Sequence, residues 1–306
     1  MKIAFFTEGG WQGSVDRNNS NMRTELAWIC ALNAHHYNIH EIPNQQYDLG
    51  VIIIPKKNPE FNIDKIKQHC KHVASMQEGP HWYFQDYPMQ QQIWFYNILQ
   101  EMDFLFVHNQ IDKKYYQGLT DKQCYVMPSL MIEDSIKQLP ETPRSGVMIG
   151  GNFCQWYGGF DSYITAQEFG TGIFVPSMGR KISGEESIPG LNHLPYMNWV
   201  QWINELNKRK YAVHLMRTHA AGTFALNCAY LGIPCIGYKG LDTQEICHPE
   251  TTIELGDITK AKQIAQKLRK DEKFYLYCSK IAKDKYKEIY HEDKFNTTFQ
   301  KQFKIS

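Results

Sequence analysis

The chain has 306 residues, with 33 Lys and Arg against 32 Asp and Glu and 42% hydrophobic residues, which suits two globular domains of about 150 residues each. No apolar stretch approaches the ~20 residues of a membrane-spanning helix, and the apolar run 2–7 is too short for a signal peptide. The eight cysteines are scattered and form no Cys-x-x-Cys pair, so we expect reduced thiols and no structural zinc. These features favour a cytoplasmic protein without membrane spans.

The first half of the chain alternates apolar runs with helical patterns. Strands are predicted at 2–7, 37–42, 47–54, 73–76, 104–108 and 124–127, and helices near 23–32, 62–72 and 90–101. Strands and helices that alternate in this way favour a parallel sheet with helices on both faces.

Residues 128–146 differ from this pattern, because Pro140, Pro143 and the polar residues around them are typical of an interdomain linker. A second cycle follows, with strands predicted at 147–149, 172–176, 211–216 and 234–237, and helices at 160–167, 199–206, 221–231 and 259–290. The fold class predicted is therefore α/β, with two Rossmann-like domains facing each other across a cleft. The predicted organisation is a first domain 1–127, a linker 128–146, a second domain 147–274 and a helical segment 275–306 that could pack back on the first domain.

The charge of the chain is uneven, although its sum is close to zero. From Asp257 to Ser306 there are 13 Lys and Arg against 7 Asp and Glu. A basic segment of this kind can meet phosphates. A solvent-exposed helical face with lysines for solubility is the more common explanation. The charge distribution alone therefore does not identify a binding partner.

Two glycine pairs follow predicted strands, at the edge where open α/β sheets bind their ligands. Gly9-Gly10 ends the first strand of the first domain, and Gly150-Gly151 ends the first strand of the second. Neighbouring glycines let the backbone approach a ligand closely and leave N–H groups free for an anion. Neither pair belongs to a Gly-x-Gly-x-x-Gly fingerprint or a P-loop. We consider Gly9, Gly10 and Gly151 as candidate donor-binding residues on this weak signal.

The segment 214–229 is the most informative part of the sequence. A predicted strand ends near Met216, and a helix begins near Gly222 and Thr223. The free N–H groups of a helix start attract an anion, and the preceding Arg217, Thr218 and His219 add positive charge or hydrogen-bond donors. An ordinary loop with a surface arginine explains the same residues equally well.

Residues 147–257 resemble the donor-binding domain of the two-Rossmann (GT-B) glycosyltransferases, particularly the retaining ones. The family pattern is an acidic residue, Gly-Phe-Gly, a second acidic residue eight positions after the first, and then Ala-Met-Ala-x-Gly-x-Pro-Val-Ile. Here the run from Asn227 through Gly232-Ile-Pro-Cys-Ile236 matches in register, while His219 and Asn227 stand at the two acidic positions. The resemblance implies that Asn227 shares the ribose contact by hydrogen bonding and leaves the role of His219 open.

The same resemblance implies further contacts to a UDP-sugar donor. Arg180, after a predicted strand, stands where the family often has a basic phosphate contact, and a guanidinium can bind phosphate in a bidentate way. Tyr196 lies in the segment that corresponds to the base-recognition loop. Gly240–Glu245 resembles the Gly-Gly-x-x-Glu turn of the family. The fold implies no cofactor; Mg²⁺ could assist the diphosphate, but no Asp-x-Asp motif is present and we assign no metal ligand.

The whole chain also resembles the glycosyltransferases of large tailed phages, through the segments 77–80, 82–87, 148–153 and 156–160. Some enzymes of that group glycosylate hydroxymethylated pyrimidines in phage DNA, which implies double-stranded DNA as a partner and glucose or a pentose such as arabinose as the sugar. A phage origin would place the protein in the host cytoplasm. We expect a monomer or a weak dimer.

The acceptor side is predicted in the loop 77–86. Glu78, His81 and Asp86 are candidate bases for an acceptor hydroxyl. Trp82 and Tyr83 could stack on an unstacked base or fill a core. Stereochemistry stays open, because a retaining enzyme of this fold typically places no protein base there.

Three classes of function remain. A glycosyltransferase acting on DNA, glycans or proteins is favoured. A sugar-nucleotide epimerase or hydrolase of the same architecture would need no acceptor. A nucleic-acid-binding module without catalysis would show DNA affinity that weakens steeply with salt.

Overall fold

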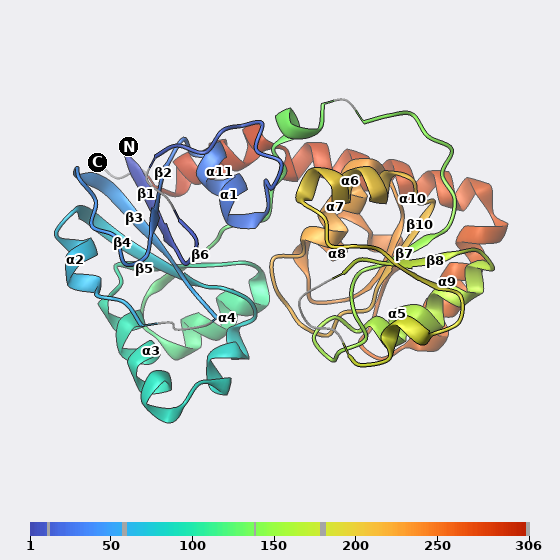
Figure 1. The fold of residues 1–306 in the computed structure, drawn as a ribbon, viewed down its shortest axis with the longest axis horizontal. Coiled ribbons are helices and arrows are strands. Elements are labelled where there is room, and N and C mark those ends of the chain that lie inside the picture. Colours follow the sequence, from blue (N-terminus) through green and yellow to red (C-terminus); the bar gives the residue numbers. More distant parts are fainter. Residues whose placement is uncertain (11–12, 57–59, 138, 178–181, 304–306) are drawn as a thin grey trace.

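The computed structural model describes residues 1–10, 13–56, 60–137, 139–177 and 182–303. Figure 1 shows two lobes side by side, each with a sheet and its covering helices. Within the described residues, no helix is long and apolar enough to cross a membrane. All eight cysteines are free thiols, and only Cys154 among them is not buried.

The first sheet has six parallel strands in the order β2-β1-β3-β4-β5-β6. The strands are β1 (Ile3–Thr7), β2 (His35–Asn38), β3 (Tyr47–Ile54), β4 (Cys70–Gln77), β5 (Phe104–Val107) and β6 (Gln123–Val126). Their side chains alternate between two apolar layers: Val51 packs in one and Ile52 in the other. Burial on both faces explains why these strands are continuous apolar runs.

Helices cover both faces of this sheet. On one face lie α2 (Ile63–Lys67), α3 (Met89–Glu101) and α4 (Gln110–Leu119). The 3-10 helix η1 (His81–Asp86) lies on the same face and directly precedes α3 in the chain. On the other face lie α1 (Thr24–Ala31) and α11 (Glu292–Gln302). The last helix of the chain therefore returns to the first domain, as Figure 1 shows and as we predicted.

The second sheet is also parallel, in the order β12-β11-β10-β7-β8-β9. Its strands are β7 (Val147–Ile149), β8 (Ile173–Val175), β9 (Leu191–His193), β10 (Tyr211–His214), β11 (Cys235–Tyr238) and β12 (Thr252–Ile253). The order reverses between β7 and β10, which is the topological switch point at which doubly wound folds bind ligands. The two Rossmann-like sheets confirm the predicted fold class.

The helices of the second domain form two layers. One layer continues into the apolar core of the first domain. It contains α6 (Trp199–Asn207), α7 (Thr223–Leu231), α8 (Asp242–Cys247), α10 (Glu272–Lys285) and the π-helical turn η6 (Tyr286–Tyr290). The opposite layer holds α5 (Gly159–Ala166) and α9 (Ile258–Lys270). Short 3-10 turns occur at η2 (Glu133–Ile136), η3 (Gln167–Phe169), η4 (Glu185–Ser187) and η5 (Pro249–Thr251).

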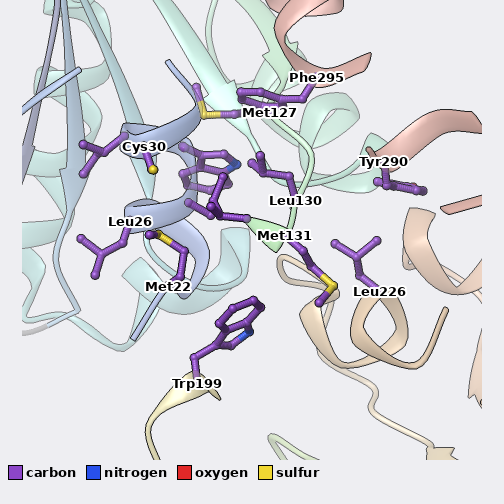
Figure 2. Packing of buried hydrophobic residues seen from close by; sticks show 14 of the residues in the cluster. Met22, Leu26, Cys30, Met127, Leu130, Met131, Trp199, Leu226, Tyr290 and Phe295 are labelled. Carbon is purple, nitrogen blue, oxygen red and sulfur yellow. The ribbon is translucent and has the colours of Figure 1, made fainter. Parts of the chain in front are cut away.

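One apolar cluster runs through both domains. Figure 2 shows Met22 and Leu26 of the first domain, Leu130 and Met131 of the connection, and Leu226 of α7 within it. Leu130 and Met131 are 4% and 1% exposed. The start of the predicted linker is thus buried, and it is part of the core that fixes one domain against the other.

Phe299 of α11 is the central aromatic of the packing between this helix and the first sheet. Its ring stacks on Phe106 of β5 at 6.0 Å and lies 4.7 Å from the ring of Phe303. We expect Phe299→Ala to lower the free energy of unfolding by about 3–5 kcal/mol, because the lost apolar contacts leave a cavity. Urea unfolding measures the change. Leu276→Ala on the exposed side of α10 is the matched control, and an equal loss in both variants would contradict the packing described.

Several predicted elements differ from the structure in their bounds, two of them substantially. The helix predicted at 62–72 ends at Lys67, because Cys70–His72 pair with the start of β3 as part of β4. The strand predicted at 37–42 is His35–Asn38. We did not predict α4, although Asn109 caps it by accepting a hydrogen bond from Asp112 N at 2.8 Å, which is an ordinary helix-start signal.

Candidate functional site

A cavity of about 340 Å³ lies between the two domains. This volume is within the range of small-molecule sites. The first domain and connection contribute Met22, Arg23, Thr24, Glu25, Lys56, Glu78, Gly79, His108 and Leu130 to its lining; the second domain contributes Gly150, Trp156, Tyr157, Pro176, Ser177, Pro195, Met197, Trp199, Trp202, His214, Met216, Ala220, Ala221, Gly222, Thr223, Phe224 and Asn227.

The cavity lies at the carboxyl ends of strands in both sheets. Gly150 directly follows β7, His214 is the last residue of β10, and Met216 lies two residues after it. The lining therefore includes residues at the ends of both strands of the switch point. In the first sheet, Lys56 and Glu78 follow β3 and β4. This is the position at which open α/β sheets bind their ligands.

The N-terminus of α7 opens on this cavity. Gly222 precedes the helix with φ +68°, and no side chain caps the helix start. Thr243 holds the turn from behind, because its Oγ1 donates a 2.8 Å hydrogen bond to the Gly222 carbonyl. The first N–H groups of a helix lack intrahelical partners and carry partial positive charge. Such N–H groups at the cavity wall are suited to bind an anion.

Asn227 is one turn further along α7. It lines the cavity, is 4% exposed, and makes no side-chain hydrogen bond within the described residues. Its carboxamide offers both a donor and an acceptor to a ligand. Around it the wall is apolar, formed partly by Trp199 and Trp202. A ring-bearing ligand with a few hydroxyl groups suits these surroundings.

The wall formed by the first domain is charged. The Lys56 ammonium pairs with the Glu78 carboxylate, and Glu25 from the first turn of α1 lines the same wall. Burial raises the pKa of the Glu25 carboxyl, and a hydrogen bond from its own backbone N–H acts in the opposite direction. The charge of Glu78 raises this pKa further, while the charges of Lys56 and Arg23 lower it. A carboxyl group of this kind in a cavity is suited to proton transfer.

Two histidines line the cavity from the ends of β5 and β10. Burial lowers the pKa of His108, and lowers that of His214 to about 4. His214 packs tightly: its ring lies 4.8 Å from that of Phe224, and a Cβ added to Gly150 would lie 2.1 Å from its Cδ2. Both rings are neutral at physiological pH and help to form an uncharged floor.

The polar residues before α7 do not reach this cavity. Arg217 is half exposed and pairs with Asp161 at 3.1 Å, and Thr218 is 3% exposed. His219 lies against Gly240, where an added Cβ would be 2.2 Å from its Nε2. Burial lowers the pKa of His219, so this side chain is neutral at physiological pH.

Of the predicted acceptor residues, only Glu78 lines the cavity. His81 is bound to Asp112, with Nδ1 2.7 Å from Oδ1, and Asp86 is exposed at the end of η1. Trp82 and Tyr83 pack on Trp156 of the second domain, at 5.4 and 5.3 Å. Trp82 and Tyr83 therefore join the domains rather than stand free.

The remaining predicted donor residues lie around the site or away from it. Gly9 is exposed, and Gly10 packs against β2, since an added Cβ would lie 1.9 Å from the Tyr37 carbonyl oxygen. Gly151 packs under Tyr157, because a Cβ added to Gly151 would lie 2.7 Å from the Cβ of Tyr157. None of these three glycines lines the cavity.

Tyr196 is 70% exposed at the rim, with the Arg23 guanidinium 5.6 Å from its ring centroid. Arg23 also donates a hydrogen bond of 2.5 Å to the Met197 carbonyl, so this contact joins the domains at the cavity edge. Arg180 lies outside the described residues. Among the residues that the structure describes, no three His, Cys, Asp or Glu side chains are grouped to hold a metal ion.

The cavity residues that sequence reasoning missed are Glu25, Lys56, His108, His214, Trp156, Trp199 and Trp202. Lys56 lies two residues after the strand predicted at 47–54, and His108 is the last residue of the strand predicted at 104–108; a place at the end of a strand was a usable signal. Nothing in the local pattern distinguishes Glu25 from an ordinary acidic residue of a first helical turn.

Comparison with known proteins identifies the fold. No family model and no curated protein sequence matches the chain. Among solved structures, sucrose-phosphate synthase from Thermosynechococcus elongatus has a TM-score of 0.67 at 9% identity, over 100% of both chains. Anabaena HepE in complex with UDP-glucose has a TM-score of 0.64 at 10% identity, over 99% of both chains.

A third similar structure is S. aureus TarM in complex with UDP, with a TM-score of 0.63 at 9% identity. The alignment covers 84% of this chain and 55% of that one, so the chain spans about half the length of TarM. At such identities the likeness concerns the fold, which is the GT-B fold of glycosyltransferases.

Proposed function

We propose that the protein is a glycosyltransferase that moves a sugar from a UDP-sugar to an acceptor hydroxyl. The observation that supports this most strongly is the start of α7. There Gly222, Thr223, Phe224 and Asn227 line the interdomain cavity at the switch point of the second sheet. The fold agrees, because similar structures contain UDP or UDP-glucose. A hexose donor is favoured by the same similar structures, with a pentose as the alternative.

The donor is assigned to the second-domain wall. The N–H groups of residues 223–225 bind the diphosphate, and Asn227 binds the ribose hydroxyls. Trp199 and Trp202 cover the less polar faces of the ligand. We further propose the predicted contacts of Tyr196 with the base and of Arg180 with the phosphates. Metal-independent donor binding remains our expectation.

A thermal-shift screen tests the proposed donor. UDP, UDP-glucose and UDP-arabinose are expected to raise the unfolding temperature, because a ligand at ~100 times its Kd stabilises the native state by about 2.7 kcal/mol. GDP, ADP and CMP serve as controls. A shift with ADP but none with any uridine nucleotide would contradict the UDP assignment, and no shift with any nucleotide would contradict the function.

We propose hydroxymethylated pyrimidine in double-stranded DNA as the acceptor, on the resemblance of segments 77–80, 82–87, 148–153 and 156–160 to phage enzymes. Incubation of 5-hydroxymethylcytosine DNA with UDP-glucose or UDP-arabinose is expected to add the mass of one sugar per modified base. The matched control is the same duplex with cytosine. Transfer to a glycan or protein instead would support the glycosyltransferase activity and contradict DNA as the acceptor. Release of free sugar, or an isomerised donor, without transfer would indicate a hydrolase or an epimerase.

A further inference from the structure

Glu25 combines an ordinary place in a first helical turn with a position on the interdomain cavity. It lies in the first turn of α1, and its side chain lines the interdomain cavity rather than a solvent-exposed helix face. The preceding Thr24 has φ +30°, a conformation that costs free energy in a residue with a side chain. This strained start brings Glu25 to the cavity wall.

Charged or titratable residues from three further segments line the cavity together with Glu25. Arg23 lies on its own segment, Lys56 follows β3, Glu78 follows β4 and His108 follows β5. The Lys56 ammonium pairs with Glu78, and Arg23 is bound to the carbonyl of Met197. Glu25 is therefore the carboxylate of the cavity that no cation of the described residues neutralises by direct pairing.

The wall of the second domain contributes no carboxylate to the cavity within the described lining. Its polar elements include the start of α7, Ser177, Asn227, the buried His214, Tyr157 and the tryptophan indoles. An acceptor hydroxyl placed between the two walls thus meets carboxylates on the first-domain side only, and the neutral ring of His214 on the other wall is a weak base, because burial lowers its pKa to about 4. Of the two carboxylates there, the unpaired one is better suited to receive a proton.

We infer that Glu25 is the general base of the transfer reaction; this inference rests on the proposed function. The acceptor O–H bond breaks and its proton passes to a Glu25 carboxylate oxygen. The acceptor oxygen forms a bond to the anomeric carbon, while the bond from that carbon to the β-phosphate oxygen breaks. UDP leaves with the electron pair of that bond. Lys56 and Glu78 set the charge next to Glu25.

The inference is tested with two small acceptors and UDP-glucose as donor, so that the natural acceptor need not be known. Water must lose a proton when it attacks, whereas azide is already an anion and needs no base. Glu25→Gln is expected to reduce the rate of donor hydrolysis by about 10²- to 10⁴-fold. The same variant should retain glucosyl azide formation within threefold and UDP binding within twofold of the wild type.

The pH profile gives a second readout. In the wild type, hydrolysis should fall as the pH drops and Glu25 becomes protonated, and this acidic limb should be absent in Glu25→Gln. Glu25→Asp keeps a carboxylate on a shorter side chain, so its hydrolysis should be slower but should still show the acidic limb. This variant keeps the inference testable if Glu25→Gln fails to fold. Glu250→Gln, on the exposed turn η5, is the matched control.

Several outcomes would overturn the inference. Hydrolysis by Glu25→Gln within threefold of the wild type would mean that the donor phosphate takes the proton. Equal losses of hydrolysis, azide transfer and UDP binding would make Glu25 a structural or donor-binding group. A wild-type protein that binds no UDP-sugar would refute the proposed function itself, which is a different result from either of these.

Discussion

Replacement of Gly222 by alanine is expected to abolish most UDP binding. The residue has φ +68°, and a Cβ there would lie 2.2 Å from Thr243 Oγ1. Thr243 is 3% exposed and its hydroxyl is bound to the Gly222 carbonyl, so neither side can move without disturbing the start of α7. We expect UDP affinity to fall at least tenfold, about 1.4 kcal/mol, because the N–H groups that bind the diphosphate are displaced.

Stability should fall in the same variant. A non-glycine residue in the left-handed region costs about 1–3 kcal/mol, which urea unfolding can measure alongside calorimetry of UDP binding. Adding Thr243→Ala to Gly222→Ala removes the clash and should recover part of the affinity. Gly9→Ala is the control, since no atom lies within 4 Å of a Cβ at that position. Unchanged UDP affinity in Gly222→Ala would remove α7 from the donor site.

The protein is expected to lose stability steeply as the pH falls from about 6.5 toward 4. Burial lowers the pKa of His36, His214 and His248 to about 4 each. In the unfolded chain each binds a proton near pH 6.5, whereas the folded protein does not until about pH 4. Unfolding therefore takes up protons in this range, at a cost in stability of about 1.4 kcal/mol per pH unit for each histidine. Glu25 and Asp242, whose pKa values burial raises, act in the opposite direction.

His248 offers the sharpest test of this pH dependence. Its Nε2 lies 2.9 Å from the Ala225 carbonyl of α7, and its Nδ1 lies 3.4 Å from Cys235 N of β11, so the neutral ring joins the two elements. We expect His248→Gln to reduce the slope of unfolding free energy against pH by about one proton. The exposed His40→Gln is the control. Equal stability of the wild type at about pH 7.5 and pH 5.5 would contradict the burial of neutral histidines.

The fold could be predicted largely from local patterns. The apolar runs of β3 and β10 and the glycine turns after β1 and β7 are short-range signals, and alternating strands and helices leave few possible topologies. The start of α7 was also located correctly, because Gly222 and Thr223 mark a helix boundary. The α4 helix was missed although Ile111, Tyr115 and Leu119 have helical spacing.

The candidate site was less predictable because it depends on contacts between distant segments. Glu25 and Asn227 line one cavity only because the two domains pack together through buried residues such as Met131. Arg217 and Asp86 had suitable chemistry at suitable points of the chain. The structure pairs Arg217 with Asp161 and leaves Asp86 in solvent, neither of which the local sequence reveals.

The most direct test of the account is calorimetric titration of UDP into the wild type and into Asn227→Leu. Leucine has a similar size but cannot hydrogen-bond the ribose, so UDP affinity should fall about 10- to 100-fold, which corresponds to 1.4–2.8 kcal/mol. Asn204→Leu on α6, whose amide donates to the Val200 carbonyl, is the matched control and should bind UDP as the wild type does. Saturable UDP binding that depends on Asn227 is the predicted result. Equal binding by wild type and Asn227→Leu, or no UDP binding by the wild type, would contradict a donor site at α7.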